Sequence, residues 1–340
     1  MISDSLSGVT FISVPGSVST AHFSYLQVVM GYFVGYFIIA QVLLPLYYNR
    51  KLTSIYTYLL ERYGEFAQKT GSFFFLLSRM LGAAARLYLT ASVIQLFVFD
   101  AMGVPFWLSV SIIIILILLY TYKGGIKTLV WTDTFQSAFL LLGVVLSIAA
   151  ISHELGFGFK EMVSAVSNSN MTETFYWDWH SKSFFPKQFL GGIFIAIAMT
   201  GLDQNMMQKN LSINTLKDSQ KNMRWFSLVM VIVNVFFLSL GVLLYVYANA
   251  KGISVDKTDF LFPTLALSHL GTFAGVVFIV GLTAATFSSA DSVLTTLTTS
   301  FMIDFLKKGD KDENENEIKN TRHMVHVAFA VILLGVILLF

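Results

Sequence analysis

Hydroxyl side chains and one carboxylate interrupt an apolar stretch near the C-terminal end of the sequence. Residues 281–305 carry serines, threonines and Asp291, and they continue an apolar run that starts at Phe273. At helical spacing, one face of this segment carries Ala285, Ser288, Ser289 and Ser292. Their oxygen atoms are hard ligands, which suit a small hard cation such as sodium. Serines and threonines also hold helices together in membranes, so this face admits a structural interpretation as well.

Charged residues within apolar segments are a second set of candidates. Each costs roughly 2.5 to 3.5 kcal/mol to insert at the bilayer centre, so it usually faces a cavity, a partner or an ion. They are Asp4, Arg79, Arg86, Asp133, Asp203 and Asp291. Arg79 and Arg86 lie about two helical turns apart, on roughly one face. Either could hold a carboxylate or a hydroxyl-rich solute, or could pair with a buried aspartate.

Two of these aspartates stand near expected helix ends. Asp133 is predicted to begin a helix, where it could complement the helix dipole and cap amides, or serve an ion pathway. Asp203 and Gln204 fall near the end of a short apolar segment whose glycines allow unwinding. Because irregular backbone at membrane depth is tolerated only around a cavity, polar groups there could bind solute hydroxyls. Ordinary capping of a cytoplasmic helix end is the alternative.

Composition and motifs exclude several function classes. The 340 residues are 55% hydrophobic and 12% charged, whereas a soluble domain is about 25% charged, so the sequence indicates a membrane protein. The net charge of +2 is too small to suggest nucleic acid, and the absence of cysteine excludes disulfides. The six histidines lack metal-ligand spacing and are expected at the surface. With no phosphate loop or catalytic triad order, the sequence predicts a protein that is not an enzyme, and no protein partner is evident.

The apolar segments that must position these residues approach or exceed the about 20 residues that cross a membrane. They are 23–47, 73–99, 106–122, 129–151, 189–207, 225–247, 273–305 and 323–340. Residues 1–18 are rich in serine and are predicted to form the second half of a discontinuous helix. Residues 52–70 are predicted to include a short amphipathic helix at the membrane interface.

Lysines and arginines favour the loops on one side of these spans. The loops on the other side contain Lys160, Lys182, Lys187, Lys251 and Lys257. By the positive-inside rule the basic side is cytoplasmic, which predicts a multi-pass protein of the cell (inner) membrane, surrounded by lipid.

Taken together and in this order, several stretches resemble the sodium:solute symporter family, which includes sodium/glucose, sodium/proline and sodium/sialic acid cotransporters. They are 7–16, 124–136, 203–209, 259–263 and 284–292. The resemblance implies an all-α multi-pass membrane protein with two inverted five-helix repeats of the leucine-transporter type. The first repeat would be residues 1–151, followed by an extracellular or periplasmic loop, 152–187, and a second repeat, 188–340. The fold is expected to be truncated at both ends.

The resemblance also implies binding residues. Sodium would bind to carbonyl oxygens and hydroxyls of Ser3, Leu6, Ala285, Ser288 and Ser289. Asp133 matches an aspartate implicated in sodium affinity or a second sodium site, and Asp291 is a further candidate for that site. The expected solute-binding residues are Thr10, Ser13, Arg79, Arg86, Asp203 and Gln204.

The solute is expected to be small, polar and organic. Val29 stands where the family's glucose-binding pattern has a glutamate, which argues against a simple hexose and favours an acidic sugar such as sialic acid. The predicted function is sodium-coupled symport by alternating access, with Na⁺ as the coupling ion. A membrane sensor module built on the same fold is the alternative, and a passive pore is disfavoured because the polar groups occur at paired broken-helix positions.

Overall fold

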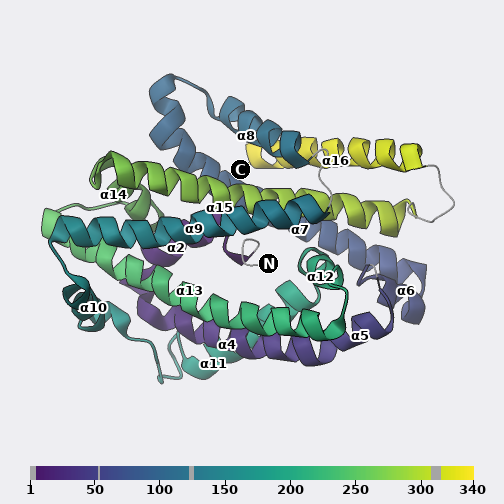
Figure 1. Ribbon diagram of the computed structural model, residues 1–340, viewed down its shortest axis with the longest axis horizontal. Helices are drawn as coiled ribbons and strands as arrows, with labels where there is room; N and C mark the ends of the chain where they lie inside the picture. The colour runs from purple at the N-terminus through teal and green to yellow at the C-terminus, as the bar shows by residue number, and fades with distance from the viewer. Residues whose placement is uncertain (1–4, 53, 122–125, 308–314) are drawn as a thin grey trace.

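The computed structural model describes residues 5–52, 54–121, 126–307 and 315–340. Within these residues the secondary structure is helical apart from an isolated bridge between Tyr176 and Phe184. The long helices run roughly parallel or antiparallel along the longest axis of the molecule (Figure 1).

The first half of the chain begins with short helices and continues with long ones. Its elements are α2 (Gly8–Gly16), α3 (Val18–Ala21), α4 (Tyr25–Ile38), the π turn η2 (Ile39–Leu43), α5 (Leu44–Asn49), α6 (Thr57–Tyr63), α7 (Glu65–Ile94), the π turn η3 (Gln95–Phe99), α8 (Phe106–Thr121) and α9 (Ile126–Leu155).

The second half contains a broken span and the longest helix among the described residues. Its elements are α10 (Phe159–Ser167), α11 (Phe185–Ala196), the π turn η6 (Ile197–Gly201), α12 (Gln204–Leu211), α13 (Leu216–Lys251), α14 (Leu261–Ser268), α15 (Gly271–Ser300), the π turn η8 (Phe301–Phe305) and α16 (Glu315–Leu338).

Among the described residues, six helices are long and apolar enough to cross a membrane, and the pair of α11 with η6 and α12, bent by 65°, makes a seventh. Helix α8 is a shorter apolar helix. Each predicted apolar segment of full length coincides with one of these elements. The chain is therefore a multi-pass membrane protein, as predicted.

One short helix is found where it was predicted, and one helix boundary differs from the prediction. The short helix expected within residues 52–70 is α6, which ends at Gly64 with φ +84°, and α7 begins at the next residue. Asp133 does not begin a helix, because α9 starts at Ile126. The segment from Ile126 to Val130 contains no helix breaker, so the helix extends back through it. Asp133 thus lies about two turns inside α9, and the prediction that it caps a helix start is wrong.

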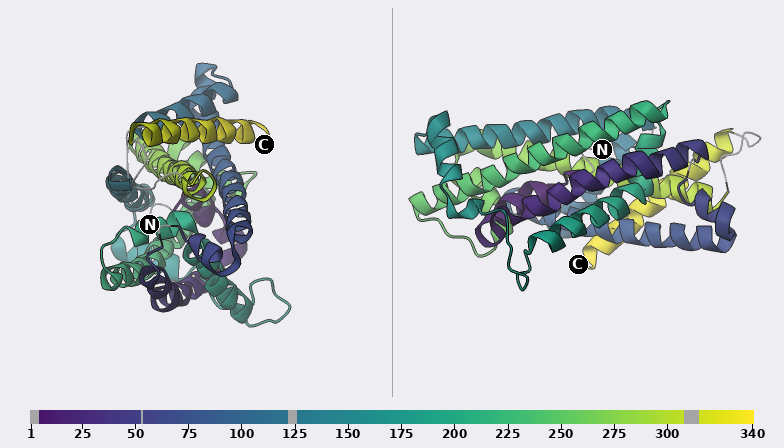
Figure 2. Two further views of the ribbon diagram at one scale, coloured as in Figure 1. Left: turned by 90° about the vertical axis from the view of Figure 1, so that its right-hand side faces the viewer. Right: turned by 90° about the horizontal axis from the view of Figure 1, so that it is seen from below.

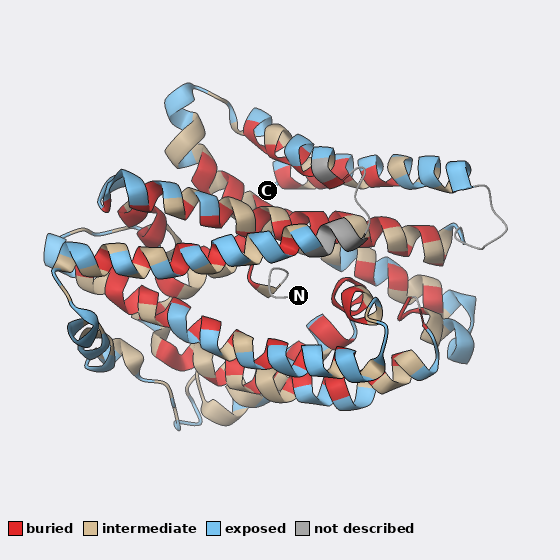
Figure 3. Cartoon of the chain, in the orientation of Figure 1, coloured by how far each residue is buried: buried red, intermediate tan, exposed pale blue. Residues whose placement is uncertain are grey.

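Helix α15 lies at the centre of the bundle. It contacts α9, α7, α14, α16 and α2, and buried residues extend along most of it (Figure 3). Helices α8 and α16 cover one side, whereas α4 and α11 lie on the opposite side, as the end-on view of Figure 2 shows. Elements far apart in the sequence thus surround the segment that carries the hydroxyl face.

The aromatic side chain of Phe11 fixes α2 in this bundle. Its ring centroid lies 6.1 Å from that of Phe237 on α13, 5.1 Å from that of Phe262 on α14 and 5.6 Å from that of Phe278 on α15. Phe11 is fully buried. Edge-to-face and tilted aromatic pairs of this kind contribute about 0.5–1.5 kcal/mol each beyond the burial of apolar area.

The predicted surface position of the histidines is wrong for His326. Its side chain is buried between α8 and α15, with hydrogen bonds to Thr121 at 2.9 Å and Thr298 at 3.1 Å. The hydroxyls satisfy both ring nitrogens, so the residue can pack inside the bundle. Within the described part of the chain, no group of three or more acidic or histidine side chains could hold a metal ion.

The two ends of the bundle carry different loops. Helix α6 lies at one end, with α12 in the same half of the molecule, and α10 and α14 lie at the other end (Figure 1). The basic stretches around α6 and α12 and the lysines of 160–187 and 251–257 therefore belong to opposite ends, as the alternation of spans requires.

The crossing of α4 and α11 depends on glycine. A Cβ atom on Gly192 would lie 2.2 Å from the carbonyl oxygen of Val28 and 3.0 Å from Cα of Gly31. The adjacent Gly191 has nothing within 4 Å of such an atom. Close backbone approach at small residues is a common way for helices to associate within membranes.

We expect Gly192→Val to lower the melting temperature of the purified protein in detergent, because the new side chain separates α11 from α4. Overpacking of this kind costs roughly 1–3 kcal/mol or more. Gly191→Val is the matched control and should leave the melting temperature nearly unchanged. Equal melting temperatures for the two variants would contradict the close crossing.

Candidate functional site

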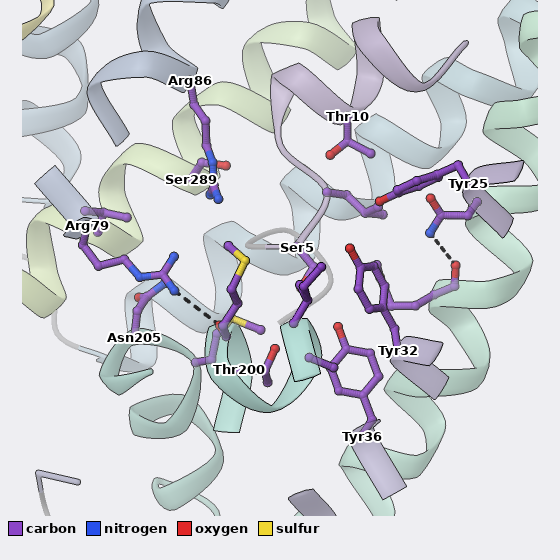
Figure 4. A pocket seen from close by; sticks show the side chains of 18 residues that line it. Ser5, Thr10, Tyr25, Tyr32, Tyr36, Arg79, Arg86, Thr200, Asn205 and Ser289 are labelled. Carbon is purple, nitrogen blue, oxygen red and sulfur yellow. Dashed lines mark hydrogen bonds between the residues drawn. The ribbon is translucent and has the colours of Figure 1, made fainter. Parts of the chain in front are cut away.

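A polar cavity of about 120 Å³ lies beside the break in the span formed by α11 and α12. Side chains from α2, α4, α7, α13 and α15 complete its wall (Figure 4). Its polar lining consists of Ser5, Thr10, Tyr25, Tyr32, Tyr36, Arg79, Arg86, Thr200, Asn205, Asn234 and Ser289. The cavity therefore draws hydroxyl, amide and guanidinium groups from both halves of the sequence.

The break itself is stabilised by polar contacts. The side chain of Asp203 accepts a hydrogen bond of 3.0 Å from the amide of Met206 and so caps α12. The hydroxyl of Tyr47 donates to the carbonyl oxygen of Gly201 at 2.8 Å. These contacts satisfy backbone groups that the interrupted helix leaves without intrahelical partners.

Asp203 also pairs with one of the two candidate arginines. Nε of Arg79 lies 2.6 Å from Oδ2 of Asp203, and the aspartate side chain is 2% exposed. The guanidinium donates in addition to the carbonyl oxygen of Met199 at 3.3 Å. Arg79 thus lines the cavity while it holds α7 against the break, and Asp203 lies behind the lining.

Arg86 lies further along the same helix, beside Ser289 (Figure 4). Both residues also border a smaller cavity of about 10 Å³, with Ser7, Gly8 and Thr90 among its other lining residues. That volume is close to the smallest that holds one water molecule. The junction of α2, α7 and α15 therefore leaves room for a single small ion or water.

The two predicted sodium-binding serines of α15 face different neighbours. Ser289 lines the cavity and donates to the carbonyl oxygen of Ala285 at 3.2 Å, and Leu6 lines the same cavity from the α2 side. Ser288 instead donates to Oδ1 of Asp133 on α9 at 2.8 Å. Ser3 lies outside the described residues.

The sequence did not reveal the partner of Asp133. Lys209 on α12 forms a buried ion pair with Oδ2 of Asp133 and donates to the hydroxyl of Ser292 at 2.8 Å. Lys209 is 8% exposed and Asp133 is 5% exposed. From the sequence, Lys209 is indistinguishable from the other basic residues near the cytoplasmic ends of the spans. The bend between α11 and α12 directs its side chain into the helix bundle. Asp291 is fully buried and does not line the cavity.

The predicted solute-binding residues are only partly brought together. Thr10, Arg79 and Arg86 line the cavity. Ser13 lies farther along α2 and is not among the lining residues. Gln204 is fully buried, and its Oε1 accepts from the amide of Ile55 at 2.9 Å, so it anchors the 52–56 segment.

Other lining residues were missed. Tyr25, Tyr32 and Tyr36 face the cavity from α4, and their spacing on one helical face was a signal that the sequence offered. Asn234 on α13 is 1% exposed and donates to the carbonyl oxygen of Met230 at 2.7 Å. Among the described residues its Oδ1 has no hydrogen-bond partner. From the sequence, a single asparagine in an apolar span does not indicate that its side chain faces a cavity.

We expect Asp203→Asn to destabilise the protein by roughly 3–5 kcal/mol, because it leaves the guanidinium of Arg79 without its counter-charge while asparagine still caps α12. The double variant Arg79→Met/Asp203→Asn should lose less than the sum of the two single variants. A thermal-unfolding cycle measures this coupling. Additive losses would contradict a direct ion pair.

A broken span beside a polar cavity, inside a bundle of membrane-spanning helices, is the architecture of a secondary transporter. The chain belongs to the sodium:solute symporter family, whose profile matches residues 1–340. That family consists of transporters rather than enzymes.

Individual relatives and a solved structure agree with the family. The sodium/sialic acid symporter NanT of Aliivibrio fischeri is 25% identical over 98% of this chain and 66% of its own length. The sodium/sialic acid symporter SiaT of Proteus mirabilis is 24% identical over 92% of this chain and 64% of its own length. The chain thus spans about two thirds of the length of these curated relatives.

A structure described as the substrate-bound outward-open state of a Na⁺-coupled sialic acid symporter matches 99% of this chain and 72% of that chain, with a TM-score of 0.86 and 21% identity. At this identity the likeness shows the fold alone. It confirms the predicted all-helical transporter fold of the leucine-transporter type.

Proposed function

We propose that the protein is a sodium-coupled symporter that moves a small polar organic solute across the membrane by alternating access. The observation that carries this proposal is the polar cavity at the break of α11 and α12, whose walls come from both halves of the chain. The sodium gradient can drive solute uptake through the concentration difference of sodium and, where net charge enters with the solute, through the membrane potential, which is worth about 2.3 kcal/mol per net charge for each 100 mV. The family and the named relatives are transporters, and nothing in these comparisons favours the sensor alternative.

Sodium would bind where α2 approaches α15. Leu6, two residues before α2, and Ser289 on α15 line one cavity, and the adjacent small cavity has room for an ion. Ser288 suits the same site because its hydroxyl donates its hydrogen to Asp133, which leaves the oxygen lone pairs for a cation. The carbonyls of Ser3 and Ala285 would complete the ligand set.

The proposed solute carries a carboxylate, as an acidic sugar does. Arg86 supplies a guanidinium at the cavity, and Arg79 supplies a second one that is already paired with Asp203. Thr10 and Asn234 add hydroxyl and amide groups suited to sugar hydroxyls. The relatives NanT and SiaT are named as sialic acid symporters, which supports the same class of solute.

The predictions of the membrane location, the partners and the division into repeats are proposed unchanged. The protein would lie in the cell (inner) membrane with the ends of α6 and α12 facing the cytoplasm, because that end carries the basic loops. Its partners would be the transported solute and bilayer lipid, without nucleic acid or a partner protein. The division into repeats 1–151 and 188–340 with the loop 152–187 remains a prediction.

We expect proteoliposomes that contain the complete gene product to accumulate an acidic sugar only under an inward sodium gradient. Ser288→Ala/Ser289→Ala should raise the sodium concentration for half-maximal uptake by roughly 10-fold or more, because two ligands of a charged ion are lost. Thr299→Ala is the control, since that hydroxyl bonds its own helix at Thr295. Uptake without sodium, or equal sodium dependence in both variants, would refute the proposed site.

We expect Arg86→Met to raise the KM for a carboxylated solute by roughly 10- to 100-fold, the range of a lost hydrogen bond between charged groups. Its effect on a neutral analogue should be small. A screen of sialic acid, hexoses and amino acids in the same uptake assay identifies the solute. Equal losses for charged and neutral solutes would exclude carboxylate recognition by Arg86.

A further inference from the structure

A buried ammonium group lies at the junction of α12, α9 and α15. Lys209 belongs to the second half of the broken span, Asp133 to α9 and Ser292 to α15. All three residues are nearly inaccessible, with exposed fractions of 8%, 5% and 0%. A lysine this deeply buried must be neutralised by a partner, and here the partner is the carboxylate of Asp133.

The ligands of this ammonium are those that a sodium ion would use. Nζ of Lys209 contacts a carboxylate oxygen and the hydroxyl oxygen of Ser292, and the other carboxylate oxygen accepts from Ser288. Ammonium and sodium are both monovalent cations that prefer hard oxygen atoms. The carboxylate of Asp133 therefore already has both oxygens engaged and its charge balanced.

We propose that Lys209 is a tethered cation that occupies the cation position at Asp133, so that this carboxylate binds no second sodium ion. Transport is then coupled to one sodium ion, bound between α2 and α15. This inference rests on the proposed symport function and replaces the prediction that Asp133 contributes to a second sodium site.

The tether also connects the sodium site to the broken span. Ser288 is adjacent to Ser289, which lines the solute cavity, and its hydrogen bond leads through Asp133 to Lys209 on α12. The ammonium is covalently part of α12, whereas a bound ion could leave. Any displacement of α12 relative to α9 and α15 must therefore break or carry along this ion pair.

The first test is the ratio of sodium ions to solute molecules taken up by the wild-type protein in proteoliposomes, measured from the uptake of labelled sodium and labelled solute. We expect one sodium ion per solute and a Hill coefficient for sodium of about 1, since this coefficient cannot exceed the number of coupled sites. A ratio of two sodium ions per solute would overturn the proposal while leaving sodium-coupled symport intact. This measurement does not depend on any variant folding.

The second test removes the ammonium but keeps the apolar stem, with Lys209→Met. Asp133 then needs a mobile cation, so sodium should raise the melting temperature of this variant by more than it raises that of the wild type, measured against an organic cation in place of sodium. Lys209→Arg and Asp133→Asn/Lys209→Met should show only the wild-type sodium effect. Lys217→Met, at an exposed position of α13, is the control for lysine loss.

The two tests separate the two levels of the proposal. If the wild type shows no sodium-coupled uptake, the proposed function is wrong. The melting temperatures of the variants still test whether Lys209 occupies a cation position at Asp133. An extra sodium-dependent rise in Lys209→Met supports the tethered cation. The same sodium effect in Lys209→Met as in the wild type, or an extra effect that persists in the Asp133→Asn double variant, contradicts it.

Discussion

The structure depends on one constraint, which is that the polar face of α15 must be satisfied within the protein because a bilayer offers no hydrogen-bond partners. The helix meets this constraint at successive levels along its length. Ser289 faces the polar cavity, and Ser288 and Ser292 hydrogen-bond to Asp133 and Lys209, respectively. Further along, Asp304 follows the helix and has its own neutral donors.

That last level shows a buried carboxylate that neutral donors hold within the described part of the chain. Asp304 is 1% exposed and accepts from Ser300 at 2.7 Å, from Ser72 at 2.8 Å and from Gln68 at 3.1 Å. These donors tie the end of α15 to the start of α7. The contrast with Asp133, which is balanced by an ammonium group, indicates that these two buried carboxylates have different tasks: Asp304 closes a helix junction, and Asp133 lies beside the proposed ion site.

The broken span gives these contacts their geometry. The bend of 65° turns α12 inward, which places Asn205 at the cavity and Lys209 at Asp133. A straight helix could not present both groups to the core helices, because its next turns would continue along the original axis. The break also frees Asp203 to cap α12 and to pair with Arg79. The interruption of the helix therefore has three consequences: it forms part of the cavity wall, it allows Asp203 to pair with Arg79, and it buries the ammonium group of Lys209.

The sequence by itself determined the class of fold, the order of the spans and the hydroxyl face of α15, since hydropathy and helical spacing are local properties of the chain. It also identified Arg79, Arg86 and Thr10 as candidates that line the cavity. Only the tertiary structure decided which partner each buried charge takes. The pairing of Lys209 with Asp133 joins residues from different helices, and it depends on a bend whose angle no local pattern encodes. Gln204 and Ser13 do not line the cavity for the same reason. Their polar side chains suited such a cavity, but the orientation of their helices directs them elsewhere.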